Sequence, residues 1–254
     1  MDTATKGTPD SIVPIVADLG FAGMSAHIGN FETLTPTLKE KGLNLYATYY
    51  TTALDADKPA LEAQPTLRDL IDRLGNTSTT LWLGITKITR DGTTLQPSQV
   101  PDPLVAARLH EIVSYAAEHK VPVSLYPHAG FFVEHVEHAL LLTRLTALPN
   151  LTITFNLCHW LKVEGDRDPT PVLKEALPHL GFVTLNGANR GDTKTLSWNE
   201  LIQTIGSGSY DLPAFTQVLQ TIGYTGPIGL QHYGIPGDWK ENLTLSMTGW
   251  KALP

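Results

Sequence analysis

The sequence contains a single cysteine, Cys158, and no long run of apolar residues. One cysteine excludes an internal disulfide and any zinc or iron–sulfur site built from cysteines. The longest apolar stretches fall far short of the roughly 20 residues that a membrane-spanning helix needs. The chain has 18 basic against 25 acidic residues, with no basic run. Because nucleic-acid phosphates are bound by clustered basic side chains, this charge pattern predicts no nucleic-acid partner. The short apolar stretches likewise predict no membrane partner.

The 254 residues suffice for one large hydrophobic core, and no linker or shift in composition divides them. Stretches with helical periodicity alternate with short apolar runs, and glycines separate most helices from the next strand. We predict helices over residues 10–19, 31–41, 66–74, 103–120, 131–148, 171–180, 212–222 and 238–251. We predict strands over residues 23–28, 43–50, 80–86, 121–126, 151–155, 182–185 and 227–231. Repeated strand–helix units with short links are typical of a parallel sheet wrapped by helices.

The fold class that we predict is α/β, a (β/α)8 TIM barrel forming a single domain over residues 1–254. The pattern contains one strand fewer than a closed barrel needs, and it opens on a helix. The barrel is therefore either incomplete or missing its first strand at the N-terminus, with residues 2–5 as the tail of that strand. An open doubly wound sheet is disfavoured, because no strand is followed by the glycine-rich fingerprint of dinucleotide-binding folds.

Alternation along each strand predicts which side chains face the barrel interior, because successive residues point to opposite faces of a sheet. The predicted interior residues include Ser25, His27, Tyr46, Thr48, Tyr50, Gly84, Thr86, Ser124, Thr154 and Thr184. Barrel enzymes have their active sites at the C-terminal ends of the strands. The groups predicted there are neutral hydrogen-bonding side chains and aromatic rings, namely Tyr126, His128, Asn156, His159, Trp160, Asn186, Gln231 and Tyr233.

Amides and hydroxyls flanked by aromatic rings suit a ligand that has many hydroxyl groups and no full charge, such as a sugar. We therefore predict a small-molecule carbohydrate as the partner. The predicted substrate-binding residues are Tyr126, Asn156, Trp160, Asn186, Gln231 and Tyr233. A homo-oligomer is compatible with the sequence, and the compartment stays open between cytoplasm and periplasm.

Four short motifs carry a resemblance to a known family. They are Tyr126-Pro-His128, Asn156-Leu-Cys-His159, Thr184-Leu-Asn186 and Gly223-Tyr-Thr-Gly-Pro-Ile-Gly-Leu-Gln231. In their order the motifs resemble the xylose-isomerase-like TIM barrels, which include the sugar phosphate isomerases and epimerases, and the similarity runs over nearly the whole chain. The resemblance implies an enzyme of carbohydrate metabolism, an isomerase, epimerase or lyase, that moves a proton next to a sugar carbonyl. It also implies a divalent metal, often manganese, held by Glu, Asp, His and Glu at four successive strand ends.

The sequence departs from the family pattern at all four metal-ligand positions. By the resemblance these positions fall at Tyr126, Asn156, Thr184 and Gln231, which are all neutral. Because hard divalent cations are held largely by anionic oxygens, we predict no metal and no other cofactor. If a metal is bound, the resemblance implies manganese or another divalent ion. The Tyr-Pro-His and Asn-Leu-Cys-His motifs resemble a metal-free branch found beside pathways of 3-keto-glycosides.

Without a metal, His128 and His159 are the candidate catalytic residues, because imidazole titrates near neutrality. The amides of Asn156, Asn186 and Gln231 would stabilise the oxyanion of an enediol. We expect isomerisation, epimerisation or β-elimination on a keto sugar. One alternative is an ordinary metal-dependent isomerase or epimerase, with the metal on His128, His159 and the carbonyl oxygen of Asn156. Another is a non-catalytic sugar-binding barrel or an accessory subunit.

Overall fold

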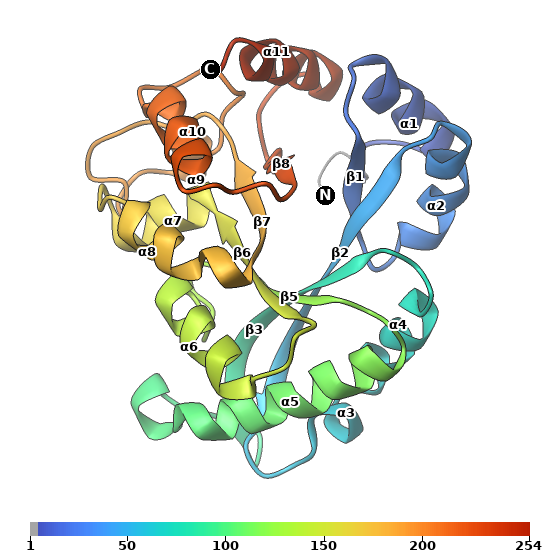
Figure 1. Cartoon of the computed structure of the whole chain (residues 1–254), viewed down its shortest axis with the longest axis vertical. Coiled ribbons are helices and arrows are strands. Elements are labelled where there is room, and N and C mark those ends of the chain that lie inside the picture. The colour runs from blue at the N-terminus through green and yellow to red at the C-terminus, as the bar shows by residue number, and fades with distance from the viewer. Residues whose placement is uncertain (1–4) are drawn as a thin grey trace.

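The computed structural model describes residues 5–254, and its strands form one sheet curled into a barrel (Figure 1). The parallel strands are β1 (Gly23–His27), β2 (Asn44–Asp55), β3 (Thr80–Arg90), β5 (Val123–Leu125), β6 (Leu151–Asn156), β7 (Leu180–Leu185) and β8 (Ile228–Leu230). The short β4 (Thr93–Thr94) pairs antiparallel with the far end of β3. Every predicted strand within residues 23–231 is confirmed. The strand tail expected at residues 2–5 lies, apart from Thr5, outside the described residues.

Helices cover the outer face of the sheet, and each predicted helix is present. These are α1 (Pro9–Asp18), α2 (Phe31–Glu40), α4 (Pro65–Leu74), α5 (Asp102–Glu118), α6 (Val136–Thr146), α8 (Thr170–Ala176), α10 (Leu212–Thr221) and α11 (Trp239–Lys251). The sequence did not predict α3 (Ala60–Ala63), α7 (Leu157–Glu164), α9 (Trp198–Leu201) or the 3-10 turn η2 (Pro97–Gln99). The helix predicted over residues 171–180 ends as the 3-10 turn η3 (Leu177–His179). Among the described residues, none of the helices has the length and apolar character needed to cross a membrane.

Helix α6 begins five residues later than predicted, because the chain before it is bound to the sheet. The backbone N–H groups of Phe132 and Val133 donate to the carbonyls of Thr86 and Ile85 on β3. These bonds are made by β3 residues that lie past the point where its pairing with β5 ends. Residues 131–135 therefore form a loop over the end of the barrel. Bound to β3 in this way, the segment follows the strand, and the first helical turn starts only at Val136.

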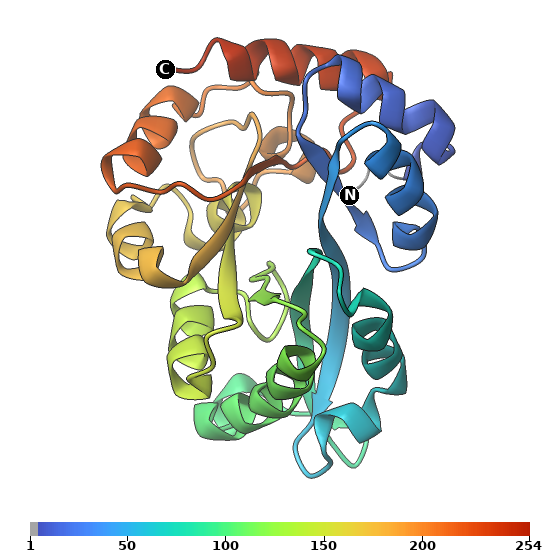
Figure 2. The ribbon, with the colours of Figure 1, turned by 45° about the vertical axis from the view of Figure 1, so that its right-hand side comes forward.

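The barrel has a seam, because β1 and β8 are the two ends of the sheet and do not pair with each other in the described part of the chain. Helices α1 and α11 lie side by side next to this seam in two views of the molecule (Figures 1 and 2). The fold is therefore a TIM barrel that is nearly closed, as the repeated strand–helix pattern predicts.

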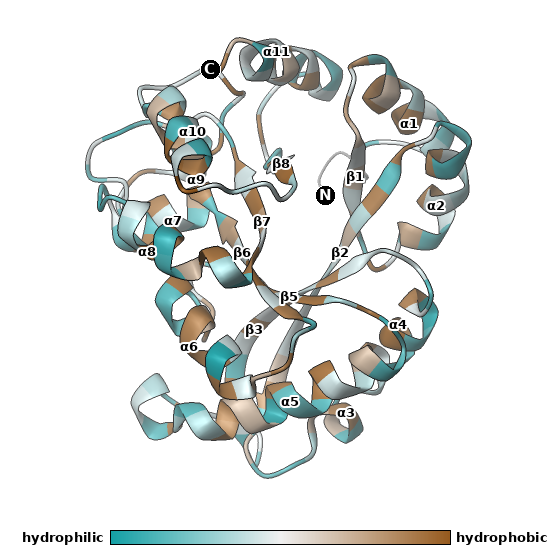
Figure 3. Ribbon diagram, in the orientation of Figure 1, coloured by the Kyte–Doolittle hydropathy of each residue, from teal (hydrophilic) through white to brown (hydrophobic). Residues whose placement is uncertain are grey.

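Apolar side chains are buried on both faces of the sheet. The larger cluster lies between sheet and helices and includes Leu83, Phe155 and Leu185. The helices accordingly carry hydrophobic residues toward the sheet and hydrophilic residues outward (Figure 3). A smaller cluster inside the barrel consists of Ala47, Trp82, Tyr126 and Phe182, with Tyr46 and Tyr49 packed against it. The barrel interior is thus aromatic as well as polar.

The predicted register is confirmed for most strands and wrong for part of β2. Ser124 and Thr154 face each other inside the barrel, with their hydroxyl oxygens 2.8 Å apart. On β2, Met24 pairs with Leu45 but the next residue, Ser25, pairs with Ala47, so that β2 has one extra residue at Tyr46. This bulge reverses the alternation after it. Tyr49 therefore belongs to the interior, whereas Thr48 and Tyr50, which we predicted inside, lie on the helix side.

Candidate active site

Tyr126 follows the last residue of β5 and lies at the centre of the site. Its side chain is 2 % exposed, and its ring contacts those of Tyr49 and Trp82, with centroids 5.0 and 5.4 Å away. Its hydroxyl oxygen accepts hydrogen bonds from Nδ2 of Asn156 and, at 3.5 Å, from Nε2 of Gln231. Burial raises the pKa of Tyr126 well above the usual range, so the phenol keeps its proton at neutral pH. Because two amides use its lone pairs, the phenol can give that proton to a ligand.

Asn156 places His159 by ending β6 and starting α7. Its Oδ1 accepts hydrogen bonds from the backbone N–H of Cys158 at 3.1 Å and of His159 at 3.4 Å. A side-chain oxygen that accepts from these two groups is a helix N-cap, which asparagine forms readily. The first turn of α7 therefore carries His159 over the end of the barrel, where 6 % of its side chain is exposed. The same asparagine binds Tyr126 and caps the helix of His159.

His128 and His159 lie in contact, with ring centroids 3.8 Å apart and ring planes 41° apart. Nδ1 of His128 lies 2.9 Å from the carbonyl oxygen of Ala129. Because a carbonyl only accepts, this Nδ1 carries the proton and Nε2 keeps its lone pair. Nδ1 of His159 is buried and has no hydrogen-bond partner among residues 5–254.

Both imidazoles are held neutral by their surroundings. Burial lowers the pKa of His128, although its hydrogen bond to Ala129 opposes the shift. Burial and, to a lesser degree, the neighbouring His128 lower the pKa of His159 well below the usual range. Desolvation disfavours the charged imidazolium, and two stacked imidazoliums would repel each other. The pair therefore offers neutral bases beside a protonated phenol, whose ring centroid is 5.9 Å from that of His159.

Two aromatic rings that the sequence did not single out flank the histidine pair. Phe131 stacks on His128 with centroids 4.1 Å apart and planes 19° apart. Trp198 meets His159 edge to face, at 5.5 Å and 77°. Phe131 has room because Gly84 has no side chain, whose Cβ would lie 3.0 Å from the phenylalanine ring. The four rings form a row in the order Phe131, His128, His159 and Trp198.

The structure brings some of the predicted substrate-binding residues together and places others elsewhere. Tyr126, Asn156 and Gln231 form one hydrogen-bonded group next to the histidines. Asn186 is fully buried, and its Nδ2 donates to the carbonyls of Gly187 and Leu201. Trp160 lies in the helix layer, where its ring packs on Phe155 and its Nε1 donates to the carbonyl of Arg167. Tyr233 is 64 % exposed.

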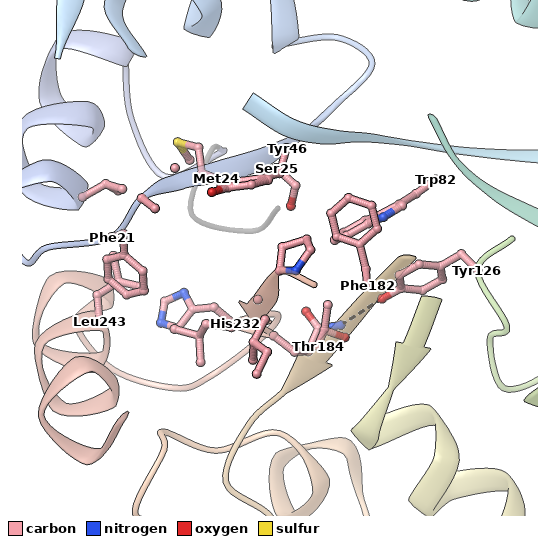
Figure 4. Close-up of a pocket in the computed structure, with 18 residues that line it drawn as sticks. Phe21, Met24, Ser25, Tyr46, Trp82, Tyr126, Phe182, Thr184, His232 and Leu243 are labelled. Carbon is pink, nitrogen blue, oxygen red and sulfur yellow. Dashed lines mark hydrogen bonds between the residues drawn. The ribbon is translucent and has the colours of Figure 1, made fainter. Parts of the chain in front are cut away.

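A cavity of about 280 Å³ lies at the seam between β1 and β8 (Figure 4). Aromatic and aliphatic side chains line most of it, among them Phe21, Met24, Trp82, Phe182 and Leu243. Its polar lining consists of Ser25, Tyr126, Thr184, Gln231 and His232, and Figure 4 shows the hydrogen bond to Tyr126. Tyr126 thus lines this cavity and also contacts both imidazoles.

The four positions that the family pattern assigns to a metal do meet in space, but their chemistry does not suit a cation. The phenol of Tyr126 stays protonated, and Asn156 turns its donor nitrogen toward it. Oδ1 of Asn156 is occupied by two backbone N–H groups and by the Cys158 thiol. Within residues 5–254 no group of three or more His, Cys, Asp or Glu side chains could hold a metal ion. The donor set therefore does not fit the hard divalent ion of the family pattern.

A family model described as xylose isomerase-like TIM barrel matches residues 13–248 of this chain. A search of curated proteins found no significant match. Among solved structures, a probable 3-DHS dehydratase from Bacillus anthracis, AsbF, superposes with a TM-score of 0.78 at 15 % identity, covering 99 % of this chain and 96 % of its own. The IOLI protein with a bound zinc atom gives a TM-score of 0.77 at 12 % identity, with coverages of 99 % and 95 %.

A third solved structure is the 3-keto-D-glucoside 4-epimerase YcjR from E. coli. It superposes with a TM-score of 0.69 at 16 % identity, covering 95 % of this chain and 94 % of the epimerase. At these identities the superpositions establish a common fold, and the family model covers most of the chain. This chain belongs to the xylose isomerase-like TIM barrel family.

Proposed function

We propose that this protein is an enzyme that moves a proton next to the carbonyl group of a keto sugar and does so without a metal. The observation that carries the proposal is the contact between two neutral imidazoles, His128 and His159, beside the protonated phenol of Tyr126. A neutral imidazole can remove a proton from carbon, and a phenol can stabilise the oxyanion that forms. The site thus contains a base and an oxyanion donor, which are the two groups that enolisation needs.

The comparisons support the reaction class. One structural neighbour is named for a 3-keto-D-glucoside and another for a dehydration. Epimerisation next to a keto group and dehydration next to a carbonyl both begin with loss of a proton from the neighbouring carbon. A 3-keto-glucoside is therefore the substrate on which we base the mechanism.

In the proposed mechanism, Nε2 of His128 takes the proton from C2 of the 3-keto sugar. The electrons of the C2–H bond form the C2–C3 double bond of an enolate, whose oxygen accepts the hydrogen bond of Tyr126. When the C3 carbonyl re-forms, those electrons make a C1–C2 double bond and expel the oxygen substituent of C1. That oxygen takes the proton from the imidazolium, which completes a β-elimination. If the imidazolium returns a proton to C2 instead, the result is exchange with solvent. If it gives the proton to C3 while the C2 hydroxyl passes its proton to the C3 oxygen, the result is isomerisation to a 2-keto sugar.

The arrangement of the histidines favours some outcomes over others. Because the rings of His128 and His159 touch, both lie on the same side of any sugar that binds against them. Epimerisation by two bases needs groups on opposite faces of the carbon. We therefore favour β-elimination or isomerisation over epimerisation for this chain.

Release of nitrophenol from 4-nitrophenyl 3-keto-β-D-glucopyranoside tests the proposal. We expect release by the wild-type protein and a loss of about 100-fold or more in His128→Gln, which is the usual contribution of a general base. We expect a smaller loss in His159→Gln, because its imidazole packs on that of His128. His179→Gln, at the opposite end of the barrel in η3, is the control and should keep full activity. Absence of release and of C2 proton exchange in the wild type would overturn the proposal, as would full activity in both site variants.

A further inference from the structure

Trp198 is an exposed aromatic residue at the end of the barrel that carries the histidine pair. It lies in the loop that follows β7, at the first position of α9, and the residue is 39 % exposed. Its ring meets that of His159 at 5.5 Å. Its place beside the histidine pair, and not its exposure alone, makes it a candidate ligand contact. Trp198 keeps more than a third of its surface in solvent, although its ring contacts His159 and lies under Nζ of Lys162, 5.7 Å from the ring centroid.

The loop holds the indole in place through several buried or short contacts. Nδ2 of Asn186 donates to the carbonyl of Leu201 at 2.6 Å, and Nζ of Lys162 donates to that of Leu196 at 2.7 Å. The hydroxyl of the fully buried Thr193 donates to the carbonyl of Leu161 at 2.6 Å. A side chain that is positioned before the ligand arrives loses little entropy on binding. The backbone on both sides of Trp198 is therefore anchored before a ligand arrives.

We propose that Trp198 is the surface on which the substrate's sugar ring stacks, so that the substrate is a closed pyranose ring. This inference rests on the proposed function for the location of the sugar. The faces of a pyranose carry C–H groups that pack on an aromatic ring, while the hydroxyl groups around its rim stay free for hydrogen bonds. An open-chain sugar has no flat face of this kind. Stacking on Trp198 would hold one edge of the ring beside His159 and His128.

Trp250 shows that exposure alone does not indicate this role. It is 37 % exposed and lies near the end of α11, the last helix of the chain. Its exposure nearly equals that of Trp198, so that Trp250 is a matched control for the loss of a solvent-exposed indole.

Kinetics on 4-nitrophenyl 3-keto-β-D-glucopyranoside test the inference through KM. Trp198→Ala should raise KM about tenfold while kcat changes by less than about threefold, because stacking stabilises substrate and transition state alike. Trp198→Phe keeps an aromatic face and should restore most of the affinity. Trp250→Ala should leave KM and kcat unchanged. An unchanged KM in Trp198→Ala would overturn the inference.

Binding of sugars that do not react separates this inference from the proposed function. We would measure the affinity of methyl β-D-glucopyranoside and of the open-chain sorbitol by NMR saturation transfer. We expect the glucoside to bind at least about tenfold more tightly than sorbitol, and Trp198→Ala to remove that difference. If binding depends on Trp198 and the wild type has no activity, the inference stands and the proposed function fails. If turnover occurs but glucoside affinity is independent of Trp198, the inference is wrong and the proposed function stands.

Discussion

The imidazole rings of His128 and His159 lie 3.8 Å apart, centroid to centroid, although the residues come from different strand ends. His128 follows β5, and His159 lies in the first turn of α7 after β6. Each is kept neutral by burial, and protonation of one disfavours protonation of the other. The pair therefore favours the neutral form, which is the form that a general base needs before it takes a proton.

The rate should follow the neutral form of the pair. Because burial lowers the pKa of both imidazoles below the usual 6.5, they are unprotonated at pH 7 and become protonated only in more acidic solution. We expect kcat/KM to be constant across neutral pH and to fall below pH 6.5 as the pair is protonated. The pH profile of nitrophenol release measures this directly. A rate that rises on acidification through the same range would show that the imidazolium is the active form.

Folding stability should depend on the same groups. The pKa of His159 is lowered in the folded protein, so the unfolded chain binds a proton more readily as pH falls through 6.5. The contribution of the neutral His159 to the free energy of unfolding is therefore complete above pH 6.5. It is lost as the pH falls from 6.5 toward the lower pKa that His159 has in the folded protein. We expect a smaller drop in Tm between pH 7 and pH 5 for His159→Gln than for wild type, with His179→Gln like wild type. Equal drops in all three proteins would contradict the assignment.

Tyr126→Phe should weaken both the chemistry and the fold. Loss of the phenol removes the oxyanion donor and leaves the N–H groups of Asn156 and Gln231 buried without their acceptor. We expect kcat to fall about 100-fold. We expect the free energy of unfolding to fall by about 1–3 kcal/mol. Tyr115→Phe, which removes a hydroxyl bound to Asp72 on the outer surface, is the control for activity. Full activity in Tyr126→Phe would exclude the phenol as the oxyanion donor.

Asn186→Ala should act on substrate affinity through Trp198. Its amide holds the carbonyl of Leu201 in α9, so the variant frees the loop that carries the indole. We expect KM to rise and kcat to change little, together with a loss of stability. Asn150→Ala removes a similar side-chain bond, to the carbonyl of Val113 at 2.9 Å, and should lower stability without changing KM. Equal KM values for the two variants would show that Asn186 has only a structural role.

Strand positions and most of the strand register follow from sequence because apolar alternation determines which face is buried. Ser124 and Tyr126 face the interior for this reason. The bulge at Tyr46 was not predictable, because tyrosines at 46, 49 and 50 suit either face. The same alternation could have predicted that Trp82 faces the interior, because it lies two residues before Gly84, which is predicted inside.

The histidine pair was predictable in part, because its motifs follow neighbouring strands of a parallel sheet. The helix start at Asn156 was missed, although asparagine is a preferred N-cap. Phe131 and Trp198 depend on loops whose conformations come from long-range bonds such as Phe132 to Thr86 and Asn186 to Leu201. Such bonds have no local sequence pattern.

Deuterium exchange at C2 of methyl 3-keto-β-D-glucopyranoside, measured with chelator-treated protein in deuterated buffer, tests the central claim most directly. The account predicts that the metal-depleted protein exchanges the C2 proton as fast as protein loaded with manganese. It also predicts that His128→Gln abolishes exchange in both. Exchange that vanishes with the metal and returns with manganese would contradict the account, because the neutral residues Tyr126, Asn156, Thr184 and Gln231 would then support metal chemistry.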